Sequence, residues 1–212
     1  MSASATPSVR RASVQRTTRE TDVRVALRVD GSGRIDVATG IGMLDHLFTS
    51  IAFHAGWDLE LTCRGDLEID DHHTAEDCAL VLGQALFEAL GDRAGTERFG
   101  DALVPLDEAL ARCAVDLSGR PFARVELGLV RPMLGALACE NVTHVLQSFA
   151  MAARLTLHVE LLSGANDHHR AEAAFKSLAV ALRRATARRT RSGDSATFES
   201  TSNVPSTKGV LS

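Results

Sequence analysis

Two short stretches of the chain carry the same histidine-rich pattern. Residues 71–77 read DHHTAED and residues 167–173 read DHHRAEA, so each copy has two adjacent histidines and a glutamate four residues after the first. On a helix, residues four apart lie on one face, whereas adjacent residues point about 100° apart. The first histidine of each pair can therefore share a metal ion with the glutamate, while the second histidine can hardly bind the same ion.

The similarity extends beyond these two stretches. Residues 45–52 read DHLFTSIA and residues 143–150 read THVLQSFA, which places His46 and His144 at matching positions. These two histidines are 98 residues apart and the paired histidines are 96 apart, so the offset is nearly constant. Such a repeat predicts duplication of a strand–helix–strand–helix unit, with paired sites related by a pseudo-two-fold axis.

Six histidines and two glutamates at symmetric positions favour metal binding over surface or capping roles. The symmetric arrangement gives each ion two residues of one element and the second histidine of the other, that is His168, Glu172 and His73 for one ion, and His72, Glu76 and His169 for the other. His46 and His144 remain, one in each half, to complete the two sets. Three imidazoles and one carboxylate leave two positions open on a six-coordinate ion, which indicates substrate chemistry. Such donors suit Mn²⁺, Fe²⁺ or Zn²⁺, and an open octahedral site favours Mn²⁺ or Fe²⁺.

Hydrophobic periodicity predicts the elements that position these residues. In the first half we expect a hairpin of strands at 23–29 and 34–39, a helix at 43–54, a strand at 58–63 and a helix from the doubled element to about residue 90. In the second half we expect strands at 101–106, 109–117, 122–129 and 155–162, and helices at 141–154 and from the second doubled element to about residue 188. The expected fold is α+β, one domain at 14–190 made of duplicated β-α-β-α half-units at about 14–100 and 101–190.

Composition excludes several classes of protein. The 212 residues have a formal net charge of −4, so the chain lacks the basic excess of proteins that bind nucleic-acid backbones. No apolar run has the length needed to cross a membrane. Four cysteines without a CxxC spacing predict reduced thiols in a cytoplasmic protein. Polar composition predicts a disordered tail at 1–13 and a C-terminal tail at 191–212.

Five motifs together resemble those of the imidazoleglycerol-phosphate dehydratase family. They are LDH at 44–46, DHHTAED at 71–77, DLSGRP at 116–121, NDHH at 166–169 with Glu172, and PSTKG at 205–209. The resemblance covers nearly the whole chain, from residue 19 to residue 209. It implies a duplicated α+β fold like domain 2 of ribosomal protein S5.

The resemblance also implies the metal sites and the assembly. It implies two Mn²⁺ ions per active site, with His46 joining His73, His168 and Glu172, and His144 joining His72, Glu76 and His169. The family assembles into a shell of twenty-four subunits with metal sites at the interfaces. We therefore expect a homo-oligomer in which half-sites are completed between chains.

The activity implied by the resemblance is dehydration of D-erythro-imidazole-glycerol phosphate to imidazole-acetol phosphate, in histidine biosynthesis. The proton to be removed sits on an unactivated carbon, and a metal-stabilised imidazolate would help expel the neighbouring hydroxyl. Glu20 and Glu172 match the family's candidates for moving protons. Fixed positive charge and hydrogen-bond donors for the substrate are implied at Arg98, Arg120, Lys176, Ser206 and Lys208. Glu20 and His54 are further candidate substrate contacts.

Other functions fit parts of the pattern. The ligands alone would suit a dinuclear metallohydrolase equally well, and a metal-storage or structural shell would bind ions without turnover. The candidate phosphate contacts and Glu20 argue against storage, because ion binding has no use for them. An RNA-binding module is opposed by the net charge of −4, and a fold by itself does not decide function.

Overall fold

The computed structural model describes residues 9–189 and 204–205. Much of the two tails expected from the sequence falls outside these residues, as do Ser206 and Lys208. The described part of the chain forms two halves with the same order of elements, which is three strands, a helix, a strand and a helix. The duplication expected from the sequence is confirmed, with two strands added before each β-α-β-α unit.

The first half forms a four-stranded sheet in the order β1-β2-β4-β3, covered by two helices. Its elements are β1 (Arg11–Thr17), β2 (Thr21–Arg28), β3 (Ile35–Ala38), α1 (Gly42–Ala55), β4 (Asp58–Gly65) and α2 (His72–Leu90). Alternation along β2 buries Val23, Val25 and Leu27 on the side that packs against α2. Burial of this apolar face is the main force that holds the helix on the sheet.

The second half repeats this plan with a sheet in the order β5-β6-β10-β7. Its elements are β5 (Phe99–Leu106), β6 (Ala109–Asp116), β7 (Phe122–Glu126), α3 (Cys139–Ala152), β10 (Thr156–Ser163) and α4 (Asp167–Thr186), with a short extra hairpin of β8 (Met133–Leu134) and β9 (Leu137–Ala138) before α3. β3 runs parallel to β4, and β7 runs parallel to β10. The two parallel pairs occupy equivalent edges of the two sheets.

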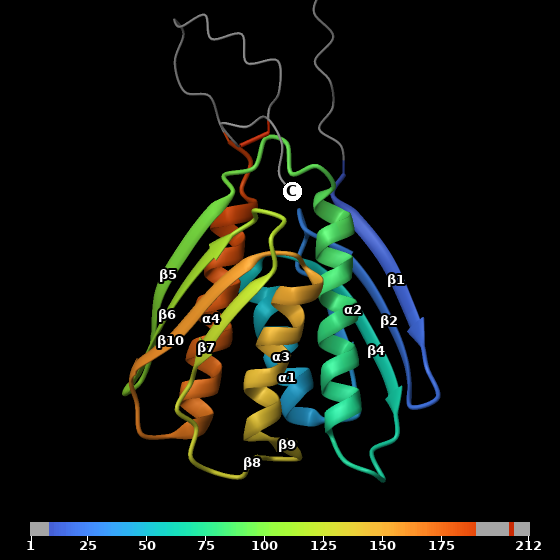
Figure 1. Cartoon of the computed structure of the whole chain (residues 1–212), viewed down its shortest axis with the longest axis vertical. Helices are drawn as coiled ribbons and strands as arrows, with labels where there is room; N and C mark the ends of the chain where they lie inside the picture. The colour runs from blue at the N-terminus through green and yellow to red at the C-terminus, as the bar shows by residue number, and fades with distance from the viewer. Residues whose placement is uncertain (1–8, 190–203, 206–212) are drawn as a thin grey trace, which may run out of the picture.

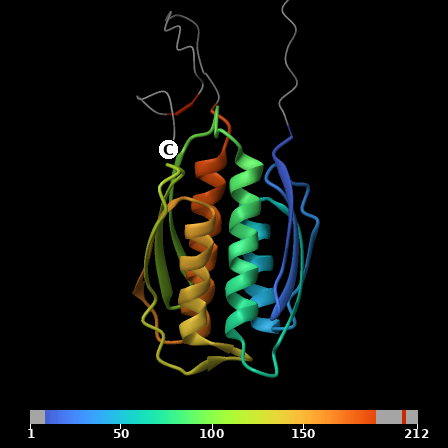
Figure 2. The ribbon, with the colours of Figure 1, turned by 45° about the vertical axis from the view of Figure 1, so that its right-hand side comes forward.

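The four helices lie between the two sheets, which form the outer layers (Figures 1 and 2). α1 contacts α4 and α2 contacts α3, so each contact joins helices of different halves. α2 and α3 approach closely at Gly83, where an added Cβ would lie 2.5 Å from the carbonyl oxygen of Phe149. These two helix pairs decide which of the candidate ligands meet.

The hairpin expected between 23–29 and 34–39 is wrong. β4 lies between β2 and β3, antiparallel to β2 and parallel to β3. The connecting segment crosses the end of β4, where the Gly31 N–H donates to the Gly56 carbonyl at 3.1 Å and the Asp58 carboxylate accepts from the backbone N–H of Ser32 at 2.6 Å. Alternation of apolar and polar residues identifies a strand but not the strand with which it pairs. Here β2 and β3 each pair with β4 and not with one another.

The disordered tail expected at 1–13 is wrong for its last residues, because β1 begins at Arg11. β1 pairs with β2 along its whole length, although it buries only Val14. An edge strand with one face in solvent needs few apolar side chains, so composition does not reveal it. Arg10, just before the strand, is buried and forms an ion pair with Asp30.

Two further features concern the described residues as a whole. None of their helices is both long and apolar enough to span a membrane. The four cysteines form no disulfide, and Cys78, Cys113 and Cys139 are buried.

Candidate metal centres and active site

The two histidine-rich elements lie in the first turns of α2 and α4. Asn166 caps α4, because its side-chain oxygen accepts a hydrogen bond from the backbone N–H of His168 at 2.9 Å. The ring planes of His72 and His73 stand 76° apart, and those of His168 and His169 stand 75° apart. Adjacent histidines therefore present their rings differently, as helix geometry requires.

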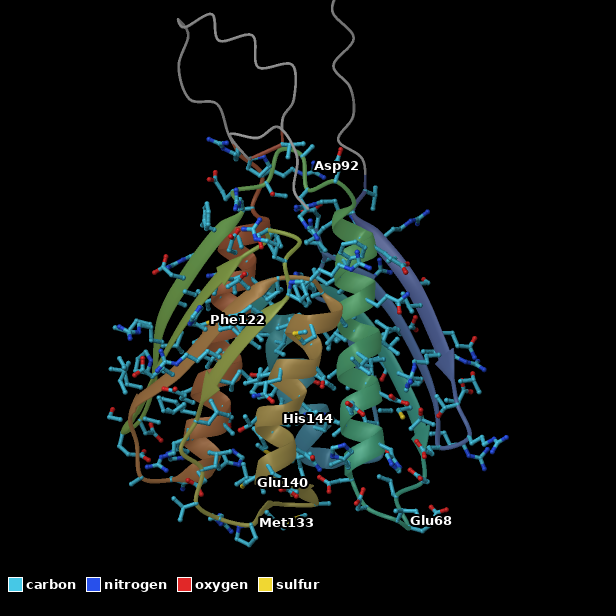
Figure 3. The ribbon with its side chains drawn as sticks, viewed as in Figure 1. Glu68, Asp92, Phe122, Met133, Glu140 and His144 are labelled. Atoms are coloured by element: carbon cyan, nitrogen blue, oxygen red, sulfur yellow. The ribbon has the colours of Figure 1, made fainter. Side chains whose placement is uncertain are left out.

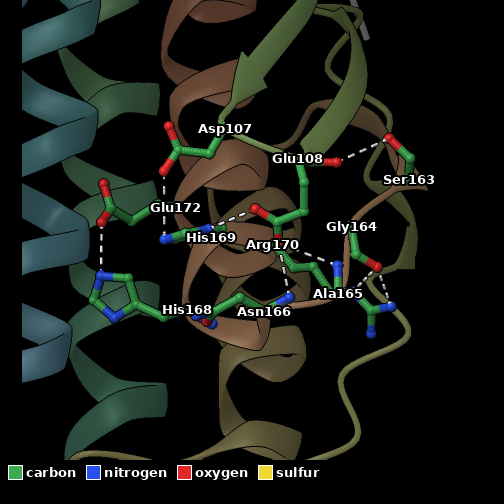
Figure 4. A network of polar contacts seen from close by, with 10 residues as sticks. All are labelled: Asp107, Glu108, Ser163, Gly164, Ala165, Asn166, His168, His169, Arg170 and Glu172. Atoms are coloured by element: carbon green, nitrogen blue, oxygen red, sulfur yellow. Dashed lines mark hydrogen bonds and ion pairs between the residues drawn. The ribbon is translucent and has the colours of Figure 1, made fainter.

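The first triad consists of His46 on α1 and of His168 and Glu172 on α4. The Nε2 atom of His168 lies 2.7 Å from Oε1 of Glu172, a contact that Figure 4 displays. The Nε2 atom of His46 lies 3.2 Å from the same oxygen. The two imidazole rings stack with centroids 5.9 Å apart. Contact between α1 and α4 thus brings together residues that are more than a hundred positions apart in the sequence.

The second triad consists of His72 and Glu76 on α2 and of His144 on α3, where Figure 3 labels it. The Nε2 atom of His144 lies 3.0 Å from Oε1 of Glu76. The rings of His72 and His144 stack with centroids 5.0 Å apart. Because α1 corresponds to α3 and α2 to α4 in the repeat, this triad is the counterpart of the first.

Each triad has a donor set and a spacing that fit a divalent metal ion. Within a triad, two imidazole nitrogens and one carboxylate oxygen lie within 4.8 Å of one another. Adjacent ligands of an octahedral ion, each about 2.1 Å from the metal, lie roughly 3 Å apart. The contacts of 2.7, 3.0 and 3.2 Å between ligand atoms match that spacing. Nitrogen and oxygen donors without thiolate suit Mn²⁺, Fe²⁺ or Zn²⁺.

His73 and His169 do not join either triad within one chain. The Nδ1 atom of His73 lies 3.0 Å from Oδ2 of Asp66, and its Nε2 atom lies 3.8 Å from Oε2 of Glu20. The Nδ1 atom of His169 lies 2.8 Å from Oε2 of Glu108, as Figure 4 shows. One described chain therefore gathers two imidazoles and one carboxylate around each centre, and the third imidazole expected for each ion stays a prediction.

Glu172 is held as an anion by its surroundings. Burial alone would raise the pKa of this carboxyl, but hydrogen bonds from Lys176 and His46 outweigh burial and lower the pKa to about 2. The Nζ atom of Lys176 lies 2.5 Å from Oε2 of Glu172. Oε1 thus faces the histidines of the triad while Oε2 faces the ammonium group.

Glu20 lies on the turn between β1 and β2, which is closed by internal hydrogen bonds and attached to α2 by a further one. The side-chain oxygen of Thr18 accepts hydrogen bonds from the backbone N–H groups of Glu20 and Thr21, at 3.1 and 2.9 Å. Thr21 in turn donates its hydroxyl proton to the buried carboxylate of Asp77 at 2.5 Å. Asp77 follows Glu76 on α2, so the turn that carries Glu20 is fixed to the helix that carries the second triad.

Arg98 and Arg120 lie far from the first triad of their own chain. Arg98 binds Asp116 through Nε at 2.7 Å, and Arg120 lies 3.9 Å from the same carboxylate. The backbone N–H of Arg98 donates to the Ala185 carbonyl, thirteen residues along α4 from Glu172, which corresponds to roughly 20 Å at 1.5 Å per residue. One chain therefore does not bring the two candidate phosphate contacts to this metal centre.

The segment that leads into the PSTKG motif reaches the same arginine. A guanidinium N–H of Arg98 donates to the Pro205 carbonyl at 3.0 Å. Pro205 directly precedes Ser206, which lies outside the described residues together with Lys208. The arginine pair and the start of the C-terminal motif thus belong to one region of the molecule.

His54 lies near the end of α1 and is partly buried. Burial, and then the positive charges of Lys176 and Arg183, lower the pKa of its imidazole. A neutral imidazole close to the Glu172–Lys176 pair is compatible with a substrate contact, and this role stays a prediction.

Sequence reasoning missed several polar residues beside the candidate ligands. These are Asp66, Asp77, Asp107, Glu108 and Asn141, each within hydrogen-bond or ion-pair distance of a candidate site residue or of the turn that holds Glu20. Isolated acids and amides in loops and helices are common, so residue type alone does not mark them. The repeat offers no help either, because their counterparts in the other half have different side chains.

Comparison with known proteins identifies the family. The imidazoleglycerol-phosphate dehydratase family model matches residues 39–182. The dehydratase of Schizosaccharomyces pombe is 51% identical, over 96% of this chain and 100% of its own length. A relative from Phytophthora nicotianae with the same name is 56% identical over 96% of this chain, which spans 43% of that longer protein.

Solved structures agree with this family. The imidazoleglycerol-phosphate dehydratase of Pyrococcus furiosus superposes with a TM-score of 0.77 and 38% identity, covering 93% of this chain and 100% of its own. The enzyme of Staphylococcus aureus superposes with a TM-score of 0.74 and 35% identity, covering 84% of this chain and 98% of its own. The chain therefore belongs to the imidazoleglycerol-phosphate dehydratase family, a family of hydro-lyases of histidine biosynthesis.

Proposed function

We propose that two divalent metal ions, held at the two triads, support the dehydration of imidazole-glycerol phosphate to imidazole-acetol phosphate by this protein. The dehydration follows from membership of the family, and the metal-based mechanism is our proposal. The observation that carries it is the pair of equivalent triads, each built from two imidazoles and one carboxylate on helices of different halves. In the proposed centres, His73 completes the first triad and His169 completes the second. Mn²⁺ suits these donors and the open positions.

We propose that a neighbouring copy supplies the fourth ligand of each centre. This is supported by His73 and His169, which lie outside the triads of their own chain. The distance between the arginines and the first triad also supports it. Arg98 contacts Ala185, which lies roughly 20 Å along α4 from Glu172. An assembly of subunits, of the twenty-four-subunit kind implied by the sequence resemblance, would bring one chain's arginines to another chain's metal centre.

Metal ions bound at these centres would act as Lewis acids that stabilise negative charge on the substrate's imidazole and orient it. The protein's own groups have separate tasks. Lys176 keeps Glu172 anionic, which suits a ligand, and a carboxyl with a pKa of about 2 is a weak general base. Glu20 belongs to neither triad and lies near Nε2 of His73, so we assign proton transfer to Glu20.

The substrate's phosphate requires fixed positive charge and hydrogen-bond donors. We assign this task to Arg98, Arg120 and Lys176, with Ser206 and Lys208 of the C-terminal motif. Support comes from the Pro205 carbonyl bound to Arg98, because this contact brings the motif next to the arginine pair. Asp116 holds the Arg98 guanidinium by two hydrogen bonds and so presents it in one orientation.

Turnover distinguishes the dehydratase from the alternatives. Protein stripped by a chelator and reloaded with Mn²⁺ should convert imidazole-glycerol phosphate to imidazole-acetol phosphate. Release of inorganic phosphate without the acetol product would indicate a metallohydrolase instead. Full metal content without any turnover would refute the proposed mechanism and favour storage. The cytoplasmic location expected from the sequence stays a prediction.

A further inference from the structure

Three of the proposed ligands have their second ring nitrogen bound to an oxygen atom of the protein. The Nδ1 atoms of His72, His73 and His169 lie 2.9, 3.0 and 2.8 Å from oxygen atoms of Asn141, Asp66 and Glu108, respectively. Neither an ionised carboxylate nor an amide oxygen can donate a hydrogen bond. In each contact the imidazole must therefore donate its Nδ1 proton.

This direction of donation decides which nitrogen can bind a metal. A neutral imidazole carries one proton, so a proton held at Nδ1 leaves the lone pair on Nε2. Nε2 is also the nitrogen that faces the carboxylate in the contacts of His46, His144 and His168. All six histidines thus direct Nε2 toward a proposed centre, although in the contacts of His46, His144 and His168 this nitrogen donates its proton to the carboxylate and would have to release that proton before it binds metal.

The acceptors of His73 and His169 come from different parts of the fold. Asp66 lies in the connection from β4 to α2, whereas Glu108 lies in the turn between β5 and β6. In the second half the matching residue is Gly164 by the offset of the strands or Leu162 by the offset of the paired histidines, and neither has a carboxylate. Duplication of one ancestral half therefore does not account for both contacts. The same contact, made twice from different elements, indicates a requirement at these histidines.

Glu108 is held in place by backbone hydrogen bonds, whereas Asp66 is partly buried and Asn141 is buried. Oε1 of Glu108 accepts hydrogen bonds from the backbone N–H groups of Ala165 and Asn166, at 3.1 and 2.8 Å, while Oε2 faces His169 (Figure 4). The side chain of Asp66 is 19% exposed. Asn141 is buried on α3 and reaches across to His72 on α2, so it also links the two helices of the second triad.

We infer that Asp66, Asn141 and Glu108 are positioning residues that hold His73, His72 and His169 in the Nδ1–H tautomer, with Nε2 free to bind metal. The inference rests on the proposed metal centres. Loss of an outer hydrogen-bond partner of this kind typically weakens metal affinity about 10- to 100-fold. Free imidazole exchanges between both tautomers. When the acceptor is removed, the hydrogen bond that favours the Nδ1–H tautomer is lost and the ring can adopt either one.

The tautomers can be read directly by magic-angle-spinning NMR of metal-free protein labelled with ¹⁵N-histidine, at a pH where the histidines are neutral. His73 signals are assigned by comparison with a His73→Gln variant. In the unaltered protein we expect the proton of His73 on Nδ1. In Asp66→Ala we expect a mixture of tautomers and an Mn²⁺ affinity, measured by titration calorimetry, that is about 10- to 100-fold weaker. Asp66→Asn keeps an acceptor oxygen, so it should restore part of the Nδ1–H population of His73 and part of the Mn²⁺ affinity.

Glu68→Ala is the matched control, because it removes an exposed carboxylate from the same connection. It should leave the His73 tautomer and the Mn²⁺ affinity unchanged. The inference is overturned if His73 carries its proton on Nε2 in the unaltered protein. It is also overturned if Asp66→Ala leaves the tautomer or the affinity as it was. Failure of turnover would refute the proposed mechanism instead and would leave the tautomers as measured.

Discussion

Substitution of Gly83 by alanine tests whether the close approach of α2 and α3 builds the second metal centre. The new Cβ would lie 2.5 Å from the carbonyl oxygen of Phe149, 2.8 Å from Cβ of Ala152 and 3.0 Å from the backbone nitrogen of Ala153. Two of these neighbours are backbone atoms, which cannot rotate away. The helices would have to separate by roughly 1 Å to restore ordinary contact.

Two opposing effects set the size of the change in stability. Alanine is favoured over glycine inside a helix by up to about 1 kcal/mol. Forcing an extra methyl group into a packed contact costs about 1–3 kcal/mol. We expect the second effect to win, with a net loss of about 1–2 kcal/mol in the free energy of unfolding. Glu76 lies seven residues along α2 from the contact, roughly 10 Å away, so the separation also reaches His144 and its triad.

Chemical denaturation of the metal-free protein at matched concentration measures the loss of stability, and Mn²⁺ titration measures the effect on the centres. Weaker binding is expected for half of the bound Mn²⁺, because the first triad lies between α1 and α4. Gly42→Ala is the control: Gly42 also lies in a helix but has no atom within 4 Å of an added Cβ, and it should be neutral or slightly stabilising. A Gly83→Ala protein as stable as the control, with both centres intact, would refute this reasoning.

Three other predictions follow from the site and its supports. Glu20→Gln should retain both metal ions and lose about 10²- to 10⁴-fold in kcat. Glu172→Gln should lose metal as well as activity. Loss of metal in Glu20→Gln would contradict the assignment of Glu20 to proton transfer alone. Chelation should break the assembly into smaller units if ions bridge chains, and an unchanged sedimentation profile would count against interface sites. The hydrogen bond from Arg10 lowers the pKa of Asp30 below its ordinary value of 3.8. The ionised carboxylate therefore adds to the free energy of unfolding above about pH 4. This stabilisation disappears as the pH falls through the lowered pKa. Asp30→Asn should therefore reduce stability at neutral pH, by less than about 1 kcal/mol because the site is partly exposed. The two proteins should converge in acid, and a difference that persists there would exclude this origin.

Local patterns predicted much of this fold because they report local geometry. The helices that carry His46, His72, His144 and His168 begin and end close to their expected limits, since apolar periodicity acts over a few residues and glycines follow the first two of these helices. Strand pairing is not local, and the expected hairpin of β2 with β3 fails because β4 binds both strands. β1 was missed in part because only Val14 shows its burial.

The doubled HHxxE pattern determined, by sequence alone, that each element presents one histidine beside its glutamate and a second histidine elsewhere. This follows from the helical period, which does not depend on the rest of the fold. Only the tertiary structure decided that α1 pairs with α4 and α2 with α3, and that His73 and His169 bind Asp66 and Glu108 outside the triads. Those contacts depend on how sheets and helices pack over distances that no short pattern encodes.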